Sequence, residues 1–192
     1  EKNGGCQEYP IPRYRWRMNE DLNWQNPGFK QKDNEPVVCV SWNDSKAFAD
    51  WLTSTGDGRK FRLATEAEWE FAARDRGNDR KFAAASDEIN EVGWYAKNSP
   101  RRTSPIGTKK AGALGIYDMS GNVWEWVGDT YARDYYNQAG GKNPVGPTDG
   151  HLKVIRGGGW NSHLWNCRAA KRDHALPSHR DTNQGFRLVF TN

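Results

Sequence analysis

Short apolar runs separated by long polar stretches dominate the pattern along this chain. Residues 37–40 form a run of mainly β-branched type that predicts a buried strand. Residues 154–156 predict a second strand, which runs into three consecutive glycines, and residues 185–190 predict the last one. No apolar run approaches the roughly 20 residues that a membrane-spanning helix needs. The pattern therefore predicts a small sheet and no membrane span.

The first predicted helix follows residues 37–40. Either Ser41 or Asn43 is suited to cap its N-terminus, and the Gly-Asp-Gly of residues 56–58 ends it. Four apolar residues fall at spacings that form one helical stripe: Ala47, Phe48, Trp51 and Leu52. Such a stripe predicts the face that packs on the core.

A capping box predicts the start of a second helix. Thr65 is followed three residues later by Glu68, a spacing that satisfies two backbone donors reciprocally and opens a helix over residues 67–74. Trp69 and Ala73 lie one turn apart on this helix, so we expect both to face inward.

The remaining segments read as ordered loop. Residues 1–35 mix Gly, Pro, Asn and Trp without a period and predict an irregular lead-in, and residues 76–113 and 131–150 are mostly loop. A chain of 192 residues fits one domain, residues 1–192. Two short helices, a few short strands and a high coil content indicate an α+β domain.

Composition points to an aromatic core and against nucleic acid. Ten Trp stand against two Met, and each Trp brings a large buried area with an N–H that needs an acceptor. The net charge of +4 comes from 28 basic and 24 acidic residues with interspersed signs. The short basic clusters read as solvated loop, so we expect no nucleic-acid partner. Their members are Arg13, Arg15, Arg17, Arg101, Arg102, Lys109 and Lys110.

Three cysteines, Cys6, Cys39 and Cys167, permit at most one disulfide. They show no C-x-x-C spacing of a metal site, and their number leaves the compartment open.

Two acidic residues flank a Gly-Asn turn among large apolar neighbours. Asp118 and Glu125 could converge on one hard cation, with carbonyls of the turn completing an oxygen shell. The alternative is that they cap a turn or pair with an arginine.

Five segments together resemble the formylglycine-generating enzyme (sulfatase-modifying factor) domain family. They occur in the family's order and cover the chain from about residue 36 to its end: residues 36–44, 62–74, 115–126, 156–160 and 185–188. The resemblance implies a C-type-lectin-like formylglycine-generating-enzyme fold, with a small twisted antiparallel sheet, two helices and long calcium-supported loops. It also implies that Asp118 and Glu125 bind Ca²⁺ through side chains, while Gly121 and Val123 contribute carbonyls.

The chain departs from the family pattern at its beginning. Family domains usually start with a further strand and helix, which are missing here. Unless the chain is a shortened form, we expect a second polypeptide to complete that part of the fold, because an open sheet edge leaves backbone groups unpaired.

The second departure concerns copper. The family's enzymes hold Cu(I) with two cysteines in the segment after a Gly-Gly-Ser motif, since this ion prefers thiolates. Here Ser162 and Leu164 stand near those positions, and Cys167 lies beyond them. A lone cysteine among apolar residues is typical of a core, so copper is not expected.

The C-terminal loops combine aromatic anchors with short polar residues, a mixture suited to protein or glycan recognition. The predicted ligand-binding residues are Trp160, Asn161, Ser162, His163, Leu164, Trp165, Asp173, His174, His179 and Asp181. In one family subgroup, the variable proteins of diversity-generating retroelements, these loop positions are diversified.

The function expected from these features is that of a non-catalytic ligand- or protein-binding module. Two alternatives stay open: a copper-dependent formylglycine-generating oxidoreductase acting on a sulfatase cysteine, with a displaced thiol, and a structural subunit of a bacterial assembly. The family and the calcium segment favour an exported bacterial protein, in the periplasm or at the cell surface.

Overall fold

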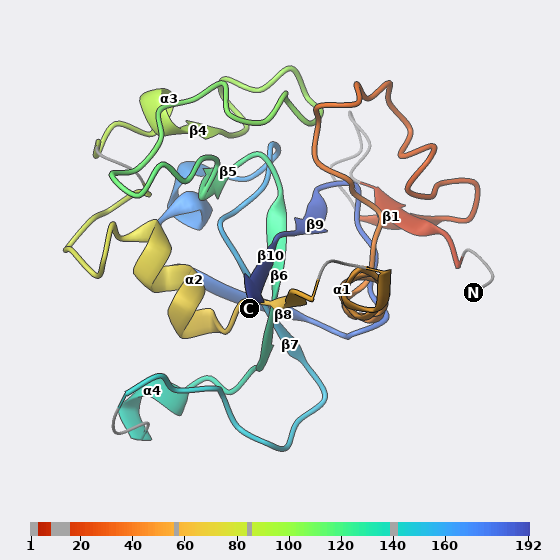
Figure 1. The fold of residues 1–192 in the computed structure, drawn as a ribbon. Helices are drawn as coiled ribbons and strands as arrows, with labels where there is room; N and C mark the ends of the chain where they lie inside the picture. The colour runs from red at the N-terminus through yellow and green to blue at the C-terminus, as the bar shows by residue number, and fades with distance from the viewer. Residues whose placement is uncertain (1–3, 9–15, 56–57, 84–85, 139–141) are drawn as a thin grey trace.

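A four-stranded sheet forms the centre of the fold (Figure 1), as seen in a computed structural model that describes residues 4–8, 16–55, 58–83, 86–138 and 142–192. Its strands lie in the order β8-β7-β6-β9. They are β6 (Trp124–Thr130), β7 (Lys153–Arg156), β8 (Arg172–Ala175) and β9 (Gln184–Phe186). β7 pairs antiparallel with both β6 and β8, whereas β6 and β9 run parallel.

In the part of the chain that the structure describes, three two-stranded pairs and four helices surround this sheet. The pairs are β1 (Cys6–Glu8) with β2 (Arg17–Asn19), β3 (Lys60–Leu63) with β10 (Leu188–Thr191), and β4 (Gly93–Trp94) with β5 (Ser120–Gly121). The helices are α1 (Trp42–Thr55), α2 (Glu66–Ala73), α3 (Ile89–Val92) and α4 (Tyr135–Gln138), with a 3₁₀ turn at Leu164–Cys167. The expected α+β class with much loop is confirmed.

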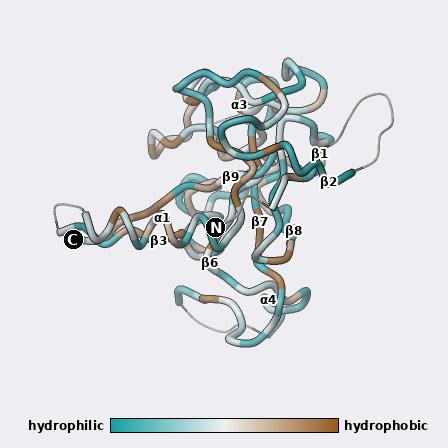
Figure 2. The backbone as a smooth tube through the Cα atoms, turned by 90° about the vertical axis from the view of Figure 1, so that its right-hand side faces the viewer, coloured by the Kyte–Doolittle hydropathy of each residue, from teal (hydrophilic) through white to brown (hydrophobic). Residues whose placement is uncertain are grey.

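The core lies on both faces of the sheet, between α1 and α2 (Figure 1). One cluster joins Trp69 and Ala73 of α2 to Val127 and Val154. The other cluster contains Leu63, Trp124, Trp126 and Ile155. Figure 2 shows the hydrophobic stretches running through the strands, while the outer loops are mostly hydrophilic.

The predicted start and inner face of α2 are confirmed. Thr65 accepts a hydrogen bond from Glu68 N (3.2 Å), and Glu68 Oε2 accepts one from Thr65 N (2.8 Å). Trp69 and Ala73 are buried, with 1% and 0% exposure.

The predicted inner face of α1 is wrong, although Ser41 does cap the helix. Ser41 and Asp44 bond reciprocally at its start, and the buried residues are the small Ser45 and Ala49. Phe48 and Trp51 are 44% and 56% exposed, and Ala47 is exposed. Small side chains let the helix approach β3 closely, so the larger ones remain outside. The Gly-Asp of residues 56–57, expected to end it, lies outside the described residues.

Two strand predictions also need correction. Residues 38–40 are buried, but residues 37–40 form no strand, because Cys39 adopts a positive φ of 59° that breaks the extended backbone. Residues 185–190 divide into β9 and β10 at Arg187, whose side chain turns to Glu125. The strand over residues 154–156 is confirmed as part of β7.

The lead-in is more ordered than the irregular segment predicted for residues 1–35. It contains the β1–β2 pair, and a disulfide joins Cys6 to Cys39. Leu22 packs with both cysteines in a small cluster. Arg13 and Arg15 of the predicted basic cluster lie outside the described residues. In the described part of the chain, no helix is both long and apolar enough to cross a bilayer.

The disulfide is expected to stabilise the fold by about 2–4 kcal/mol, because it closes a loop with a sequence separation of 33 and so restricts the unfolded chain. Guanidinium unfolding of the oxidised protein should therefore have a higher midpoint than unfolding with a thiol reductant. The double variant Cys6→Ser/Cys39→Ser should show no response to the reductant. A wild-type midpoint that the reductant leaves unchanged would contradict the pairing.

Candidate functional site

A pocket of about 390 Å³ opens on the sheet face that carries Trp124 and Ile155. All four strands of the central sheet contribute to it, together with the lead-in. Its lining residues are Gln7, Trp16, Trp124, Ile155, Asp173, His174, Ala175, Leu176, His179, Asp181, Asn183 and Gln184. The structure thus brings together four predicted binding residues from two segments: Asp173, His174, His179 and Asp181.

Strand pairing and a tight turn position these side chains. Asp173 lies opposite Ile155 in the β7–β8 register. Asp181 accepts a hydrogen bond from Asn183 N (3.2 Å) on the way into β9. The His174 ring stacks on Tyr131 at 4.1 Å between centroids, so this ring is already engaged. Asp173 and the turn at Asp181 therefore form fixed polar walls.

Burial sets the electrostatics of Asp181. The pKa of Asp181 is raised because burial disfavours its charged form, and the nearby His179 partly offsets this effect. His179 Nε2 lies 3.7 Å from Asp181 Oδ2. Asp181 can accept a hydrogen bond from a ligand, and His179 can donate one to a neighbouring atom of the same ligand.

The pocket lining does not include residues 160–165, the other six predicted binding residues. Trp160 is buried; its Nε1 donates to Thr182 O (3.0 Å), and its ring meets Phe29 edge-on. Ser162 Oγ accepts from Gly159 N (3.0 Å). Asn161 Oδ1 accepts from Asn183 Nδ2 (2.6 Å), which holds Asn183 at the pocket. Trp160 and Asn161 thus hold residues 182 and 183 beside the pocket, whereas Ser162 bonds within its own turn.

The rest of the loop lies elsewhere on the surface. His163 caps the 3₁₀ turn by accepting from Trp165 N, and Leu164 packs against the cluster around Cys167. Trp165 is 53% exposed, and its ring contacts the cationic groups of Lys81 and Arg168.

Cys167 is a core residue, as the sequence predicts. It has 0% exposure and packs with Phe82, Ile89, Val92 and Tyr95. Burial raises the pKa of its thiol to about 12, so the thiolate needed for copper binding or nucleophilic attack is strongly disfavoured. Because Cys6 and Cys39 form the disulfide, no cysteine of the chain remains to pair with Cys167.

Asp118, Val123 and Glu125 line another pocket, of about 560 Å³, together with Arg187. Arg187 donates to both Glu125 oxygens (2.6 Å each), and Trp69 Nε1 donates to Oε2 (2.6 Å). Asp118 Oδ2 accepts from Gly107 N (2.7 Å). Asp118 Oδ1 is buried without a hydrogen-bond partner among the described residues, and burial raises the Asp118 pKa.

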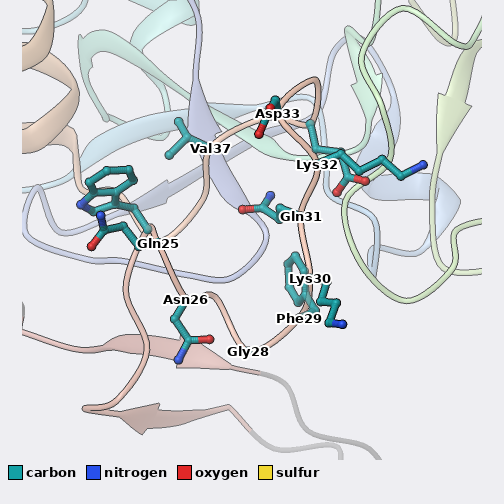
Figure 3. Close-up of a pocket in the computed structure, with 11 residues that line it drawn as sticks. Gln25, Asn26, Gly28, Phe29, Lys30, Gln31, Lys32, Asp33 and Val37 are labelled. Atoms are coloured by element: carbon teal, nitrogen blue, oxygen red, sulfur yellow. The ribbon is translucent and has the colours of Figure 1, made fainter.

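A third pocket, of about 740 Å³, lies in the lead-in loop of residues 24–37 (Figure 3). Gln31 lies near its centre, but its Nε2 already donates to Pro36 O (2.8 Å) and Thr103 Oγ1 (3.0 Å). None of the residues that line this pocket was predicted from the sequence to bind a ligand or a metal ion. We therefore do not assign ligand binding to it.

Sequence reasoning missed Gln184, Asn183, Trp124 and Trp16 as pocket residues. Gln184 and Asn183 precede the predicted strand over residues 185–190 without a pattern that marks them. Trp124 lies opposite Gln184 in the β6–β9 register, and this pairing is visible only in the fold.

A buried charge cluster beneath α2 was also missed. Asp129 is 3% exposed; its Oδ2 accepts from Glu66 N (2.7 Å), and its Oδ1 has no partner among the described residues. Glu66 is itself held by Arg172 through two hydrogen bonds (2.7 and 2.9 Å). Burial, together with the nearby Glu66 charge, raises the Asp129 pKa to about 6 despite the opposing Lys153 and Arg172.

Comparison with known proteins agrees with this fold. Residues 4–192 match the sulfatase-modifying factor enzyme 1-like domain. The chain therefore belongs to the sulfatase-modifying factor, or formylglycine-generating-enzyme-like, family, and the resemblance noted in the sequence is confirmed.

Similar proteins include enzymes and larger chains. The chain is 33% identical over 197 residues to the formylglycine-generating enzyme of Streptomyces coelicolor, covering 91% of this chain and 60% of that protein. It is 31% identical over 166 residues to the serine/threonine-protein kinase pkn1 of Chlamydia caviae, covering 85% and 25%. It thus spans less than two thirds of either relative.

Two solved structures share the fold. PvdO from Pseudomonas aeruginosa superposes with a TM-score of 0.75 at 31% identity, covering 85% of this chain and 65% of that one. Treponema denticola variable protein 1 superposes with a TM-score of 0.72 at 26% identity, covering 84% and 73%.

Asp129→Asn is expected to raise the free energy of unfolding at pH 7.5 by about 1–2 kcal/mol, since a raised folded-state pKa means that the ionised carboxylate costs stability. The native state binds the proton more tightly than the unfolded chain, so this cost is full above about pH 6 and shrinks as the pH falls towards 4. Urea unfolding of both proteins at pH 7.5 and 4.5 measures the difference. A variant less stable than the wild type at pH 7.5 would show that the negative charge is needed.

Proposed function

We propose that this chain is a non-catalytic binding module whose ligand enters the pocket over the central sheet. The observation that carries the proposal is the convergence of Asp173, His179 and Asp181, from two separate segments, on one cavity with aromatic walls. A few fixed polar groups in a cavity with aromatic and apolar walls are typical of ligand sites.

The state of the cysteines supports a role without catalysis. Ser162, near a position where the family's enzymes carry a thiol, is 7% exposed and bonded to Gly159. Cys167 is enclosed by apolar side chains. A copper-dependent oxidoreductase stays the second candidate, because the Streptomyces coelicolor relative is named a formylglycine-generating enzyme.

The disulfide supports an exported location. Disulfides persist in oxidising compartments such as the periplasm or the cell surface and are rare in the cytosol. The Cys6–Cys39 bond ties the lead-in to the core and is part of the fold.

We also propose that Ca²⁺ binds beside Asp118. The buried and unpaired Asp118 Oδ1 would gain a partner from a cation, and the backbone turns sharply at Asp118, Gly121 and Asn122, all with positive φ. Among the described residues no three His, Cys, Asp or Glu side chains are grouped to hold a metal ion, so carbonyls such as those of Gly121 and Val123 would complete the shell. Glu125 would be shared with Arg187.

Ligands recovered from panels of displayed peptides and immobilised glycans are expected to lose about tenfold in affinity with Asp173→Asn, because a carboxylate acceptor in the pocket is removed. Trp165→Ala, a change at an exposed residue outside the pocket, should leave the affinity unchanged. Surface plasmon resonance with the purified variants measures both.

The opposite pattern, a loss of affinity confined to Trp165→Ala, would place ligand recognition on residues 160–165. The oxidoreductase candidate is tested with copper and a cysteine-containing sulfatase-motif peptide, for which we expect no turnover. Turnover that disappears in Cys167→Ala would overturn the non-catalytic reading.

Millimolar Ca²⁺ is expected to raise the melting temperature relative to excess EGTA, since a ligand bound only by the native state stabilises it. The rise should vanish in Asp118→Asn and persist in Asp21→Asn, a control at an exposed position. Equal melting temperatures of the wild type under both conditions would contradict calcium binding at this segment.

A further inference from the structure

An unpaired amide donor lies at the floor of the pocket over the central sheet. Gln184 is 2% exposed, and its Nε2 has no hydrogen-bond partner among the described residues. A buried donor without an acceptor costs free energy, and such a group in a native fold calls for a specific explanation. Because Gln184 lines the pocket, an oxygen atom of a molecule entering the cavity is one acceptor that could satisfy this donor.

The pocket also offers an apolar surface next to this donor. Trp124, paired with Gln184 in the sheet register, and Ile155 form the inner wall, while Trp16 and Leu176 stand at the exposed side. An indole ring offers a large apolar face and a polar N–H at its edge. A ligand with a C–H face can pack against such a ring.

Both acidic side chains at the pocket already have a polar partner within the chain. Asp173 Oδ2 lies 3.4 Å from Lys171 Nζ, and Asp181 Oδ2 lies 3.7 Å from His179 Nε2. A strongly cationic ligand would compete with these partners. A neutral ligand that brings both hydroxyl donors and oxygen acceptors would instead add hydrogen bonds to groups that keep these partners.

The size of the pocket limits the ligand further. A volume of about 390 Å³ is at the low end for ligand sites and suits one or two small rings. The ligand must therefore be small, neutral and rich in hydroxyl groups, with an apolar face.

We propose that this pocket binds a neutral sugar ring, with a ring or hydroxyl oxygen accepting from Gln184 Nε2, hydroxyls donating to Asp173 and Asp181, and the C–H face against Trp16. The inference rests on the proposed binding function of the same pocket and narrows its ligand to a glycan.

The test is saturation-transfer NMR with the methyl glycosides of glucose, galactose, mannose and fucose. At least one is expected to bind the wild-type protein. Gln184→Leu should weaken this binding at least about tenfold while the melting temperature stays the same or rises, because the variant removes an unpaired buried donor. Gln25→Leu, at an exposed position in the lead-in, is the matched control and should bind as the wild type does.

A second pair of variants keeps the test decisive if Gln184→Leu fails to fold. Trp16→Ala and Trp165→Ala both remove a half-exposed indole, and only Trp16 lines the pocket. Weaker glycoside binding confined to Trp16→Ala supports the proposal, whereas equal binding by both variants places the sugar elsewhere and overturns it.

The outcomes also separate the sugar from the wider binding function. If no glycoside binds but displayed peptides do, and the peptides are lost in Trp16→Ala and Asp173→Asn, the sugar is overturned and the binding module stands. If bound ligands of either kind are indifferent to both variants, the pocket itself is overturned.

Discussion

The carboxylate of Glu125 is the contact on which much of this fold depends. It lies on β6, the central strand that pairs with both β7 and β9, and is 4% exposed. Trp69 from α2 and Arg187 from the C-terminal segment both donate to it. Removing one partner of such a buried pair leaves an uncompensated charge, which costs far more than a surface ion pair is worth. One side chain thus orients a helix, fixes the break between β9 and β10, and holds two parts of the chain that are distant in sequence.

Three tryptophans also join distant segments through directional hydrogen bonds. Trp42 Nε1 donates to Val127 O (2.9 Å), Trp126 Nε1 to Val40 O (3.0 Å) and Trp160 Nε1 to Thr182 O (3.0 Å). The first bond joins α1 to β6, the second joins β6 to an irregular segment, and the third joins two loop segments. A core of this kind specifies loop positions through directional bonds as well as through buried area, and it suits a chain with little regular structure.

Local signals in the sequence predicted what local physics decides. The capping box of α2, its inner face at Trp69 and Ala73, and the strand within β7 depend on spacing alone, and all three are confirmed. The features that the sequence did not predict depend on long-range contacts. The outer position of Phe48 follows from the close approach of α1 to β3, and the break at Arg187 follows from its bond to Glu125. Four of the ten predicted binding residues share the pocket because β8 and the turn at Asp181 meet there. Gln184 could not be predicted as a pocket residue, because its place in the pocket depends on the register between two strands that are distant in sequence.

The lead-in hairpin has a consequence for where this protein can work. Gln7 N donates to Arg180 O (2.8 Å), Thr182 N donates to Gln7 O (3.0 Å), and Cys39 N donates to Asp181 O (2.9 Å). One wall of the pocket is therefore carried by a segment that the Cys6–Cys39 bond fastens to the core. Reduction of that bond would leave backbone hydrogen bonds as the contacts that hold this wall, so the rigidity of the pocket is linked to the redox state of its surroundings.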